Sequence, residues 1–260
     1  MCKSLLPLLA LLLLQVQPQI GQPGKDVVWV PTLPVLVEKM LDMAHVAPQD
    51  IVIDLGSGDG RTVIAAAKRG ARALGIEYNP DMVELSTRNA ATEGVAARAT
   101  FMRADLFETD LSKATVITMF LLPDINLRLR PKILELAPGT RVVSNTFTMG
   151  DWMPDETAKI DDGCTNWCSA LLWIVPAKVS GGWKLQQGEL HLTQSFQMVG
   201  GTFEAGRASG LVVNGRVRGD QISFLVGASQ FSGRVTGDVM EGTIAADGKT
   251  TRWRATRIAA

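Results

Sequence analysis

A short apolar run followed by closely spaced glycines, at residues 51–60, constrains the fold of this chain more than any other feature. Ile51–Ile53 is continuous and β-branched, which is typical of a parallel strand buried on both faces. The turn that follows carries three glycines at alternate positions, Gly56, Gly58 and Gly60. A second apolar run then ends in Glu77. Strand, glycine loop, helix, strand and acid is the pattern of a βαβ unit that binds an adenosine-containing cofactor.

The spacing of the glycines indicates which cofactor. A dinucleotide fingerprint would place its third glycine at position 61, where this chain has Arg61. G-x-G-x-G preceded by Asp54 resembles the loop of the class I, seven-β-strand methyltransferases that use S-adenosylmethionine (SAM). The alternative is a glycine-rich turn in another α/β protein, because this spacing alone is a weak signal.

The resemblance to the SAM-dependent methyltransferases continues along the chain. It implies that Glu77 accepts hydrogen bonds from both ribose hydroxyls, for which a carboxylate is suited. A third strand over 99–104 leads to Asp105, which in the family receives the adenine amino group; the next amide contacts the ring. An alternative role for Asp105 is that of a turn residue. The cofactor-binding residues implied are Thr32, Asp54, Gly56, Ser57, Gly58, Gly60, Glu77, Tyr78, Asp105 and Leu106.

Narrower features resemble one branch of these enzymes. They are Trp-Val-Pro-Thr at 29–32, Phe-Leu-Leu-Pro at 120–123, Leu-Arg-Pro-Lys at 129–132 and Arg-Val-Val-Ser-Asn at 141–145. Over residues 27–175 the chain resembles the protein-lysine methyltransferases that modify the ATP synthase c-subunit and the adenine nucleotide carrier. The resemblance implies a protein lysine as methyl acceptor, and a role for Trp29 and Thr32 in closing the cofactor pocket. A plain extended lead-in to a helix is the alternative for 29–32.

The acceptor side can be assigned only by position. A lysine has a pKa near 10.4 and must lose a proton before it attacks, which burial in an apolar channel favours. Phe120, Leu121 and Pro123 could line such a channel, and Asp124 or Asn145 could orient the amine. Asp124 could equally be the N-cap of the following helix. Methyltransferases acting on DNA bases or glutamine often carry N-P-P-Y where this chain has Phe-Leu-Leu-Pro, which argues against those substrates.

The N-terminus suggests a location away from the cytosol. Lys3 precedes the leucine-dominated run 5–14, which is too short for a comfortable membrane span and fits a signal peptide. Residues 15–26 read as a linker. We therefore expect an exported or membrane-associated protein, although SAM is made in the cytosol. Cys164 and Cys168 could form a disulfide there or remain two thiols.

Composition narrows the partners. The 260 residues carry no formal net charge, so nucleic acid is not an expected partner. The two histidines, His45 and His191, are far from the cysteines in sequence, and we expect no metal site.

The C-terminal part has a different character. Residues 169–175 are predicted as a sixth strand and 188–197 as a seventh, closing the sheet. Beyond them Gly215–Asp220 recurs as Gly233–Asp238, and each Gly-Asp pair suits a tight hairpin. We predict a four-to-six-stranded antiparallel meander whose core includes Phe231 and Trp253. It could hold substrate, extend a dimer interface or cap the edge of the sheet.

The expected fold is therefore α/β: a Rossmann-like seven-stranded methyltransferase sheet followed by a C-terminal antiparallel β-meander. The expected division is 1–26 signal-like segment and linker, 27–197 methyltransferase domain, and 198–260 β-rich extension. The expected function is SAM-dependent methyl transfer to a protein lysine. The alternatives are a small-molecule methyltransferase, or a non-catalytic exported binding protein that uses its C-terminal module.

Overall fold

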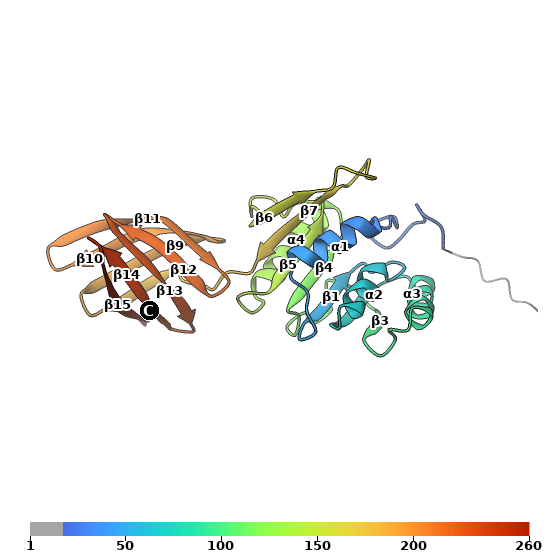
Figure 1. The fold of residues 1–260 in the computed structure, drawn as a ribbon, viewed down its shortest axis with the longest axis horizontal. Coiled ribbons are helices and arrows are strands. Elements are labelled where there is room, and N and C mark those ends of the chain that lie inside the picture. Colours follow the sequence, from blue (N-terminus) through green and yellow to red (C-terminus); the bar gives the residue numbers. More distant parts are fainter. Residues whose placement is uncertain (1–17, 260) are drawn as a thin grey trace, which may run out of the picture.

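The computed structural model describes residues 18–259, which form an α/β unit beside a closed β-barrel (Figure 1). The predicted signal-like run, 5–14, lies outside the described residues. Between residues 18 and 259, no helix is both long and apolar enough to span a membrane.

The α/β unit is built on a seven-stranded sheet in the order β3-β2-β1-β4-β5-β7-β6. Its first five strands are parallel, whereas β7 runs antiparallel to both of its neighbours. The strands are β1 (Ile51–Leu55), β2 (Arg72–Glu77), β3 (Ala99–Arg103), β4 (Val116–Met119), β5 (Arg141–Asn145), β6 (Glu156–Lys159) and β7 (Ser169–Ile174). The predicted numbering was wrong at the end of this sheet. Residues 169–174 form the seventh strand, and the sixth is the short, mostly exposed β6.

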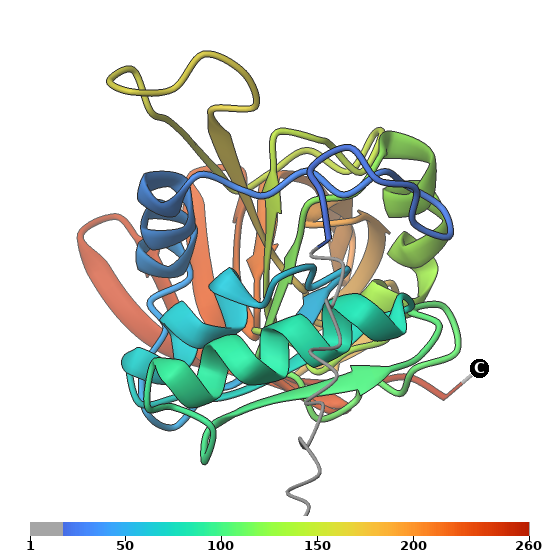
Figure 2. The same cartoon turned by 90° about the vertical axis from the view of Figure 1, so that its right-hand side faces the viewer.

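Helices cover both faces of the sheet (Figure 2). On one face lie α1 (Pro34–Met43), α2 (Arg61–Lys68) and α3 (Pro80–Thr92), and on the other lies α4 (Pro123–Leu134). Three of these helices begin with proline, whose fixed φ and missing N–H suit the first helical position. Asn79 is the N-cap of α3, because its side chain accepts a hydrogen bond from the Asp81 amide at 2.9 Å. Asp124 does not cap α4, which begins after Leu122.

The C-terminal part is an eight-stranded barrel, in the order β10-β11-β12-β13-β14-β15-β8-β9. Every pair is antiparallel, and the β8 pairing with β15 closes it. Its strands are β8 (Gly181–Leu185), β9 (Gly188–Ser195), β10 (Met198–Ala205), β11 (Ala208–Arg218), β12 (Gln221–Val226), β13 (Ser229–Thr236), β14 (Val239–Ala246) and β15 (Lys249–Arg257). Both Gly-Asp turns are confirmed, with φ of 62° at Gly219 and 56° at Gly237.

The structure corrects one sequence prediction for this region and confirms another. Residues 188–197 are not the last strand of the methyltransferase sheet, because β9 pairs only within the barrel, so the domain boundary lies near 180 rather than 197. The predicted four to six antiparallel strands in 198–260 are confirmed as six, β10–β15, and β8 and β9 join them to close the barrel. The predicted core residues are confirmed: Phe231 and Trp253 are buried and their rings lie 5.6 Å apart.

The barrel contacts the α/β unit through a small set of specific interactions. Trp152, in the loop before β6, stacks on Phe196 between β9 and β10, with ring centroids 5.8 Å apart. Next to it, Gln197 Nε2 donates to the Met153 carbonyl at 2.8 Å. Arg216 of β11 pairs at 2.6 Å with Asp155, whose side chain is 1% exposed. The barrel is therefore fixed to the β6 side of the sheet.

Candidate active site

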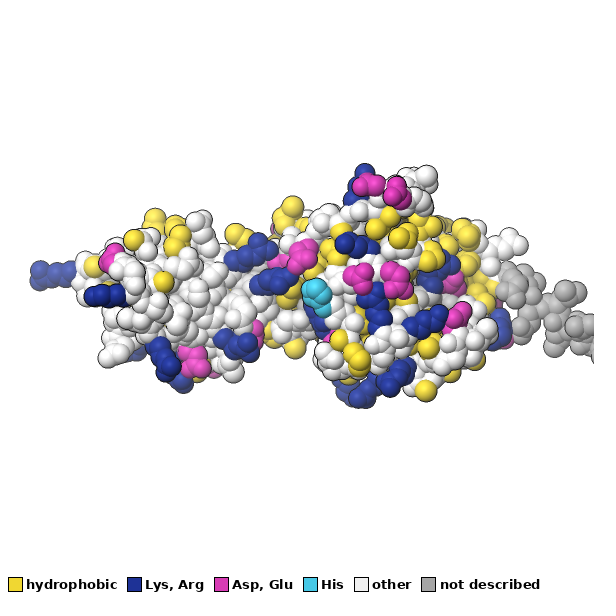
Figure 3. Space-filling model, in the orientation of Figure 1, with side chains coloured by type: hydrophobic (Ala, Val, Ile, Leu, Met, Phe, Trp, Pro, Cys, Tyr) yellow, Lys and Arg dark blue, Asp and Glu magenta, His cyan; other side chains and the backbone are white. Residues whose placement is uncertain are grey.

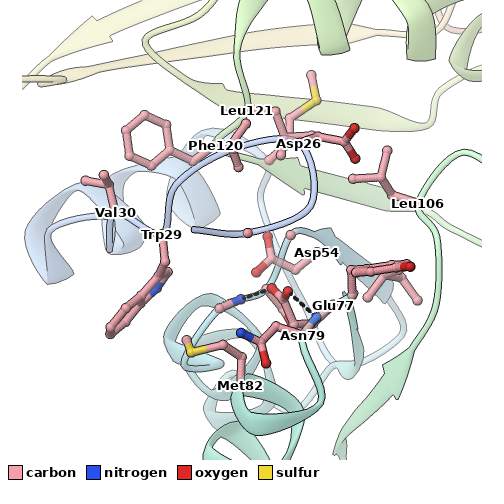
Figure 4. A pocket seen from close by; sticks show the side chains of 18 of the residues that line it. Asp26, Trp29, Val30, Asp54, Glu77, Asn79, Met82, Leu106, Phe120 and Leu121 are labelled. Atoms are coloured by element: carbon pink, nitrogen blue, oxygen red, sulfur yellow. Dashed lines mark hydrogen bonds between the residues drawn. The ribbon is translucent and has the colours of Figure 1, made fainter. Parts of the chain in front are cut away.

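A cavity of about 240 Å³ lies at the carboxyl ends of β1, β2 and β4, where open α/β sheets bind their ligands (Figure 4). Its walls come from the glycine loop after β1, the first turn of α3, the segment after β3 and the end of β4. The chain segment before α1 crosses over it, and Trp29 and Asp26 belong to that segment.

Backbone conformation in the glycine loop explains the spacing of its glycines. Gly56 and Gly58 have φ of 77° and 53°. Residues other than glycine adopt this left-handed region only at a cost in free energy. The amides of Gly56 and Ser57 both donate to the Ile76 carbonyl, which anchors the loop to β2. A Cβ on Gly58 would lie 2.6 Å from the Trp29 indole nitrogen. The Trp29 ring thus rests directly on the loop backbone.

Glu77 lines the cavity and connects the glycine loop to the start of α3. Its two carboxylate oxygens accept hydrogen bonds from the amides of Gly58 and Asn79, each at 3.0 Å (dashed lines in Figure 4). A carboxylate offers about four acceptor positions, so two remain for a ligand. The two remaining acceptor positions fit the paired hydroxyls of a ribose, which can both donate.

Asp54 is the buried acid of the site. Its carboxylate accepts a hydrogen bond from the Thr118 hydroxyl at 2.6 Å. Burial raises the pKa of Asp54 to about 7, against the lowering effect of that hydrogen bond, and the nearby charges of Glu77 and Asp59 add to the rise. A cationic group bound in the cavity would favour the ionised form of this acid.

A hairpin formed by residues 21–29 closes over the end of the cavity that contains Asp105. Gly21 donates to the Trp29 carbonyl at 2.8 Å and Trp29 donates to Gln22 at 3.0 Å. At the tip of this N-terminal hairpin, Lys25 pairs with Asp105 and lies 4.9 Å from the centre of the Tyr78 ring. The hydrogen bond from Lys25, and one from the Phe107 amide, lower the pKa of Asp105.

The structure brings most of the predicted cofactor residues together. Of the ten, all except Gly60 line the cavity. Gly60 instead packs beneath the loop, where a Cβ would meet Phe101 and Ser86 at 2.7–2.8 Å.

The five acceptor-side candidates are dispersed. Phe120 and Leu121 line the cavity, whereas Pro123 and Asp124 are exposed on the first turn of α4 and lie outside its lining. Asn145 is buried and donates from Nδ2 to the Thr32 hydroxyl at 3.2 Å, so it holds the start of α1 against β5.

Sequence reasoning missed other residues of the site. The N-terminal hairpin lies partly in the predicted linker 15–26, yet Gln22–Asp26 line the cavity. The structured part of the methyltransferase domain therefore begins before residue 27. Phe147 and Trp167 also line it, and no sequence pattern connects either of them to Phe120. Met82 could have been found, because it is the apolar residue in the first turn of the helix that follows Glu77.

Comparison with known proteins agrees with this geometry. The sequence profile of the ANTKMT methyltransferase domain matches residues 54–156, from the acid of the glycine loop to β6. A protein-lysine N-methyltransferase of Saccharolobus islandicus (strain REY15A) is 46% identical over 141 residues, which cover 53% of this chain and 88% of that protein. The chain belongs to the ANTKMT methyltransferase family. It is also 39% identical, over 120 residues, to the adenine nucleotide translocase lysine N-methyltransferase of Mus musculus, and that match covers 45% of this chain and 52% of the mouse protein.

A solved structure supports the assignment of this chain to the methyltransferases. The RNA methyltransferase from Salinibacter ruber, in complex with S-adenosyl-L-homocysteine, is 45% identical with a TM-score of 0.54, and the match covers 58% of this chain and 96% of that one. S-adenosyl-L-homocysteine is what remains of SAM after methyl transfer. This protein is a SAM-dependent methyltransferase, and its cofactor supplies an electrophilic methyl group on a sulfonium. Glu77, Asp105 and the glycine loop are the residues that would hold it.

Proposed function

We propose that this methyltransferase acts on lysine side chains of a protein substrate. The observation that carries the proposal is the 46% identity to a protein-lysine N-methyltransferase along almost the whole of that protein. Two features of the surface agree with it. The formal net charge is zero, and on the face in Figure 3 acidic and basic side chains are interspersed rather than gathered into one basic surface. Neither feature favours the phosphate contacts on which RNA binding depends.

The acceptor end of the cavity has the character that a lysine nucleophile needs. Phe120, Leu122 and Phe147 line it with apolar surface, and Asp54 is the buried carboxylate further in. This lining offers no acceptor to the three N–H donors of an unmethylated ammonium, which lowers the lysine pKa toward the working range. Once the amine is neutral, catalysis is mainly alignment of the nitrogen with the methyl group in a water-poor slot.

The test is to identify the acceptor by its chemistry. The full-length protein is incubated with radiolabelled SAM and an extract of the cells that make it, and the labelled fraction is treated with ribonuclease or with protease. We expect protease-sensitive label that yields methyllysines on acid hydrolysis, and no label with Glu77→Ala. Label lost with ribonuclease would instead assign the RNA specificity of the Salinibacter protein. Label in small solutes would assign a small-molecule acceptor.

We also infer that the protein works in an oxidising compartment, exported or at a membrane. The support is the leucine-rich run 5–14 together with the disulfide between Cys164 and Cys168, whose Cα atoms are 5.8 Å apart. Fractionation of the native cells, with blocking of free thiols at lysis, tests the location. Protein in the cytosolic fraction with both thiols free would contradict it.

A further inference from the structure

Three aromatic rings converge beside the cofactor cavity, and each comes from a different segment. Phe120 directly follows β4, Phe147 follows β5, and Trp167 precedes β7. The Phe120 and Phe147 rings are stacked with centroids 5.9 Å apart, and Trp167 meets Phe120 edge-on at 5.8 Å. All three line the cavity. We call these three residues the aromatic cluster.

The aromatic cluster lies away from the ribose-binding end of the cavity. In Figure 4, Phe120 and Leu121 are on the opposite side from Glu77 and Asn79, with Asp54 between them. The Leu121 side chain also approaches the glycine loop, where a Cβ on Gly56 would lie 3.1 Å from it. A donor whose ribose is held by Glu77 therefore extends toward the cluster, which places the cluster on the acceptor side.

The rings discriminate between methylation states of an amine. An unmethylated lysine ammonium has three N–H donors, and aromatic faces offer them no conventional acceptor. Each methyl group replaces one N–H with an apolar surface while the positive charge remains. Aromatic faces attract such cations, and quaternary ammonium groups are their best-known ligands. The cluster therefore has the chemistry to bind mono-, di- and trimethyllysine more tightly than lysine.

The loop that carries Trp167 is held in place covalently. The disulfide from Cys164 to Cys168 closes a small ring around it, and Ile160 donates to the Cys168 carbonyl at 2.8 Å. Trp167 has φ of 54°, an unfavourable value for a bulky residue that a constrained loop can maintain. Trp167 is nevertheless 44% exposed, and its ring contacts Phe120 edge-on. A residue held at a backbone cost beside a cavity is commonly functional.

We propose that the aromatic cluster is a methylammonium subsite, which retains the partly methylated lysine so that the enzyme proceeds to trimethyllysine. In each round the neutral amine nitrogen forms one N–C bond with the transferred methyl group, and the S–C bond of the sulfonium breaks with its electron pair left on sulfur. The resulting ammonium gives up a proton to solvent before the next round. The inference rests on the lysine specificity proposed above. In addition to that specificity, the aromatic cluster determines how many methyl groups the enzyme transfers to one lysine.

Binding to the protein without cofactor tests the subsite directly. The probes are tetramethylammonium and the neutral analogue 2,2-dimethylpropanol, in which carbon replaces the nitrogen and one methyl group carries a hydroxyl for solubility. Both are observed through the indole N–H signals of the full-length protein, with that of Trp167 assigned by its loss in Trp167→Leu. We expect tetramethylammonium to shift the Trp167 signal and the neutral analogue to bind about five-fold more weakly, as a cation–π contact of ordinary strength predicts. Equal affinity for both probes, or unchanged affinity in Trp167→Leu, would overturn the subsite.

Product distribution supplies the second readout. With any lysine substrate that the wild type trimethylates, we expect Trp167→Leu to accumulate mono- and dimethyllysine and Trp167→Phe, which keeps a ring, to restore trimethyllysine. The Cys164→Ser/Cys168→Ser double variant should behave like a weaker Trp167→Leu. Retained SAM binding shows that each variant is folded. Trimethylation by Trp167→Leu at the wild-type level would overturn the proposal.

Tetramethylammonium binding without any lysine methylation would refute the lysine specificity and the trimethylation step together. The aromatic cluster would then be an ammonium-binding site for a different class of acceptor.

Discussion

At the scale of single residues, Glu77 shows why β2 ends in an acid. It joins the glycine loop to the first turn of α3 and still has acceptor positions for a ligand. Glu77→Gln replaces one acceptor oxygen with an NH₂ group that faces a backbone donor. Because hydrogen bonds to a charged group are worth about 1.5–3 kcal/mol, we expect SAM affinity to fall roughly ten- to a hundred-fold in calorimetry. The exposed Glu108→Gln is the control, and equal affinity in both variants would contradict this role.

Asp54 predicts a pH dependence of stability. Its pKa is 3.8 ordinarily and about 7 in the folded protein, so between these values the folded state holds a proton that the unfolded chain releases. Stability from this group is therefore greatest at low pH and falls as the pH rises to 7. Between pH 5 and pH 8 the free energy of unfolding should drop by roughly 3 kcal/mol more in the wild type than in Asp54→Asn. Parallel urea titrations of the two proteins give this difference, and identical slopes would refute it.

The same acid predicts a pH dependence of cofactor binding. Both the sulfonium and the amino group of SAM are cationic and favour the ionised carboxylate. SAM should therefore bind more tightly to the wild type as the pH rises from 6 to 8, with protons released on binding at the lower end. Asp54→Asn should show a flatter profile. Calorimetry in buffers of different ionisation enthalpy measures the proton release.

At the scale of elements, the parallel half of the sheet was predictable and its edge was not. Each of β1, β2 and β4 is a buried apolar run followed by a turn or acid, so the local sequence identifies it. β6 has only four residues, three of them exposed, and its sequence carries no such pattern. The N-terminal hairpin was read as part of a linker because its glycines, prolines and charges are those of a linker. Its role depends on Lys25 reaching Asp105, which is a contact across 80 positions in sequence.

The N-terminal hairpin predicts a test of cofactor exchange. The ion pair of Lys25 with Asp105 holds its tip over the cavity, and both side chains are partly accessible to solvent. Lys25→Met should leave thermal stability nearly unchanged, since exposed ion pairs contribute little. It should raise the SAM dissociation rate several-fold in stopped-flow displacement, because the hairpin opens more often. Lys113→Met, on an exposed turn, is the control. A dissociation rate equal to that of the wild type would show that the hairpin does not act as a lid.

At the scale of the whole molecule, the closure of the barrel could not be predicted from the sequence. The hairpins β11–β12 and β13–β14 were foreseen from their Gly-Asp turns, since turn chemistry is local. Closure depends on β8 pairing with β15, about seventy residues away, and alternation in β9 fits a sheet edge and a barrel equally well. The methyltransferase site is complete without the barrel, because the cavity is lined by residues 22–167.

Attachment of the barrel is the last testable consequence of the fold. Arg216 pairs with Asp155, whose buried carboxylate also accepts from the Ile174 amide at 2.8 Å, whereas Arg218 pairs with the half-exposed Glu156. Removing the partner of a buried charge costs far more than removing that of an exposed one. Arg216→Met should therefore destabilise the α/β unit by about 2 kcal/mol, which lowers its calorimetric transition by roughly 4–8 °C. Arg218→Met, two residues away on the same strand, should shift it by less than about 3 °C. Equal shifts in the two variants would mean that Asp155 is not the point at which the barrel stabilises the sheet.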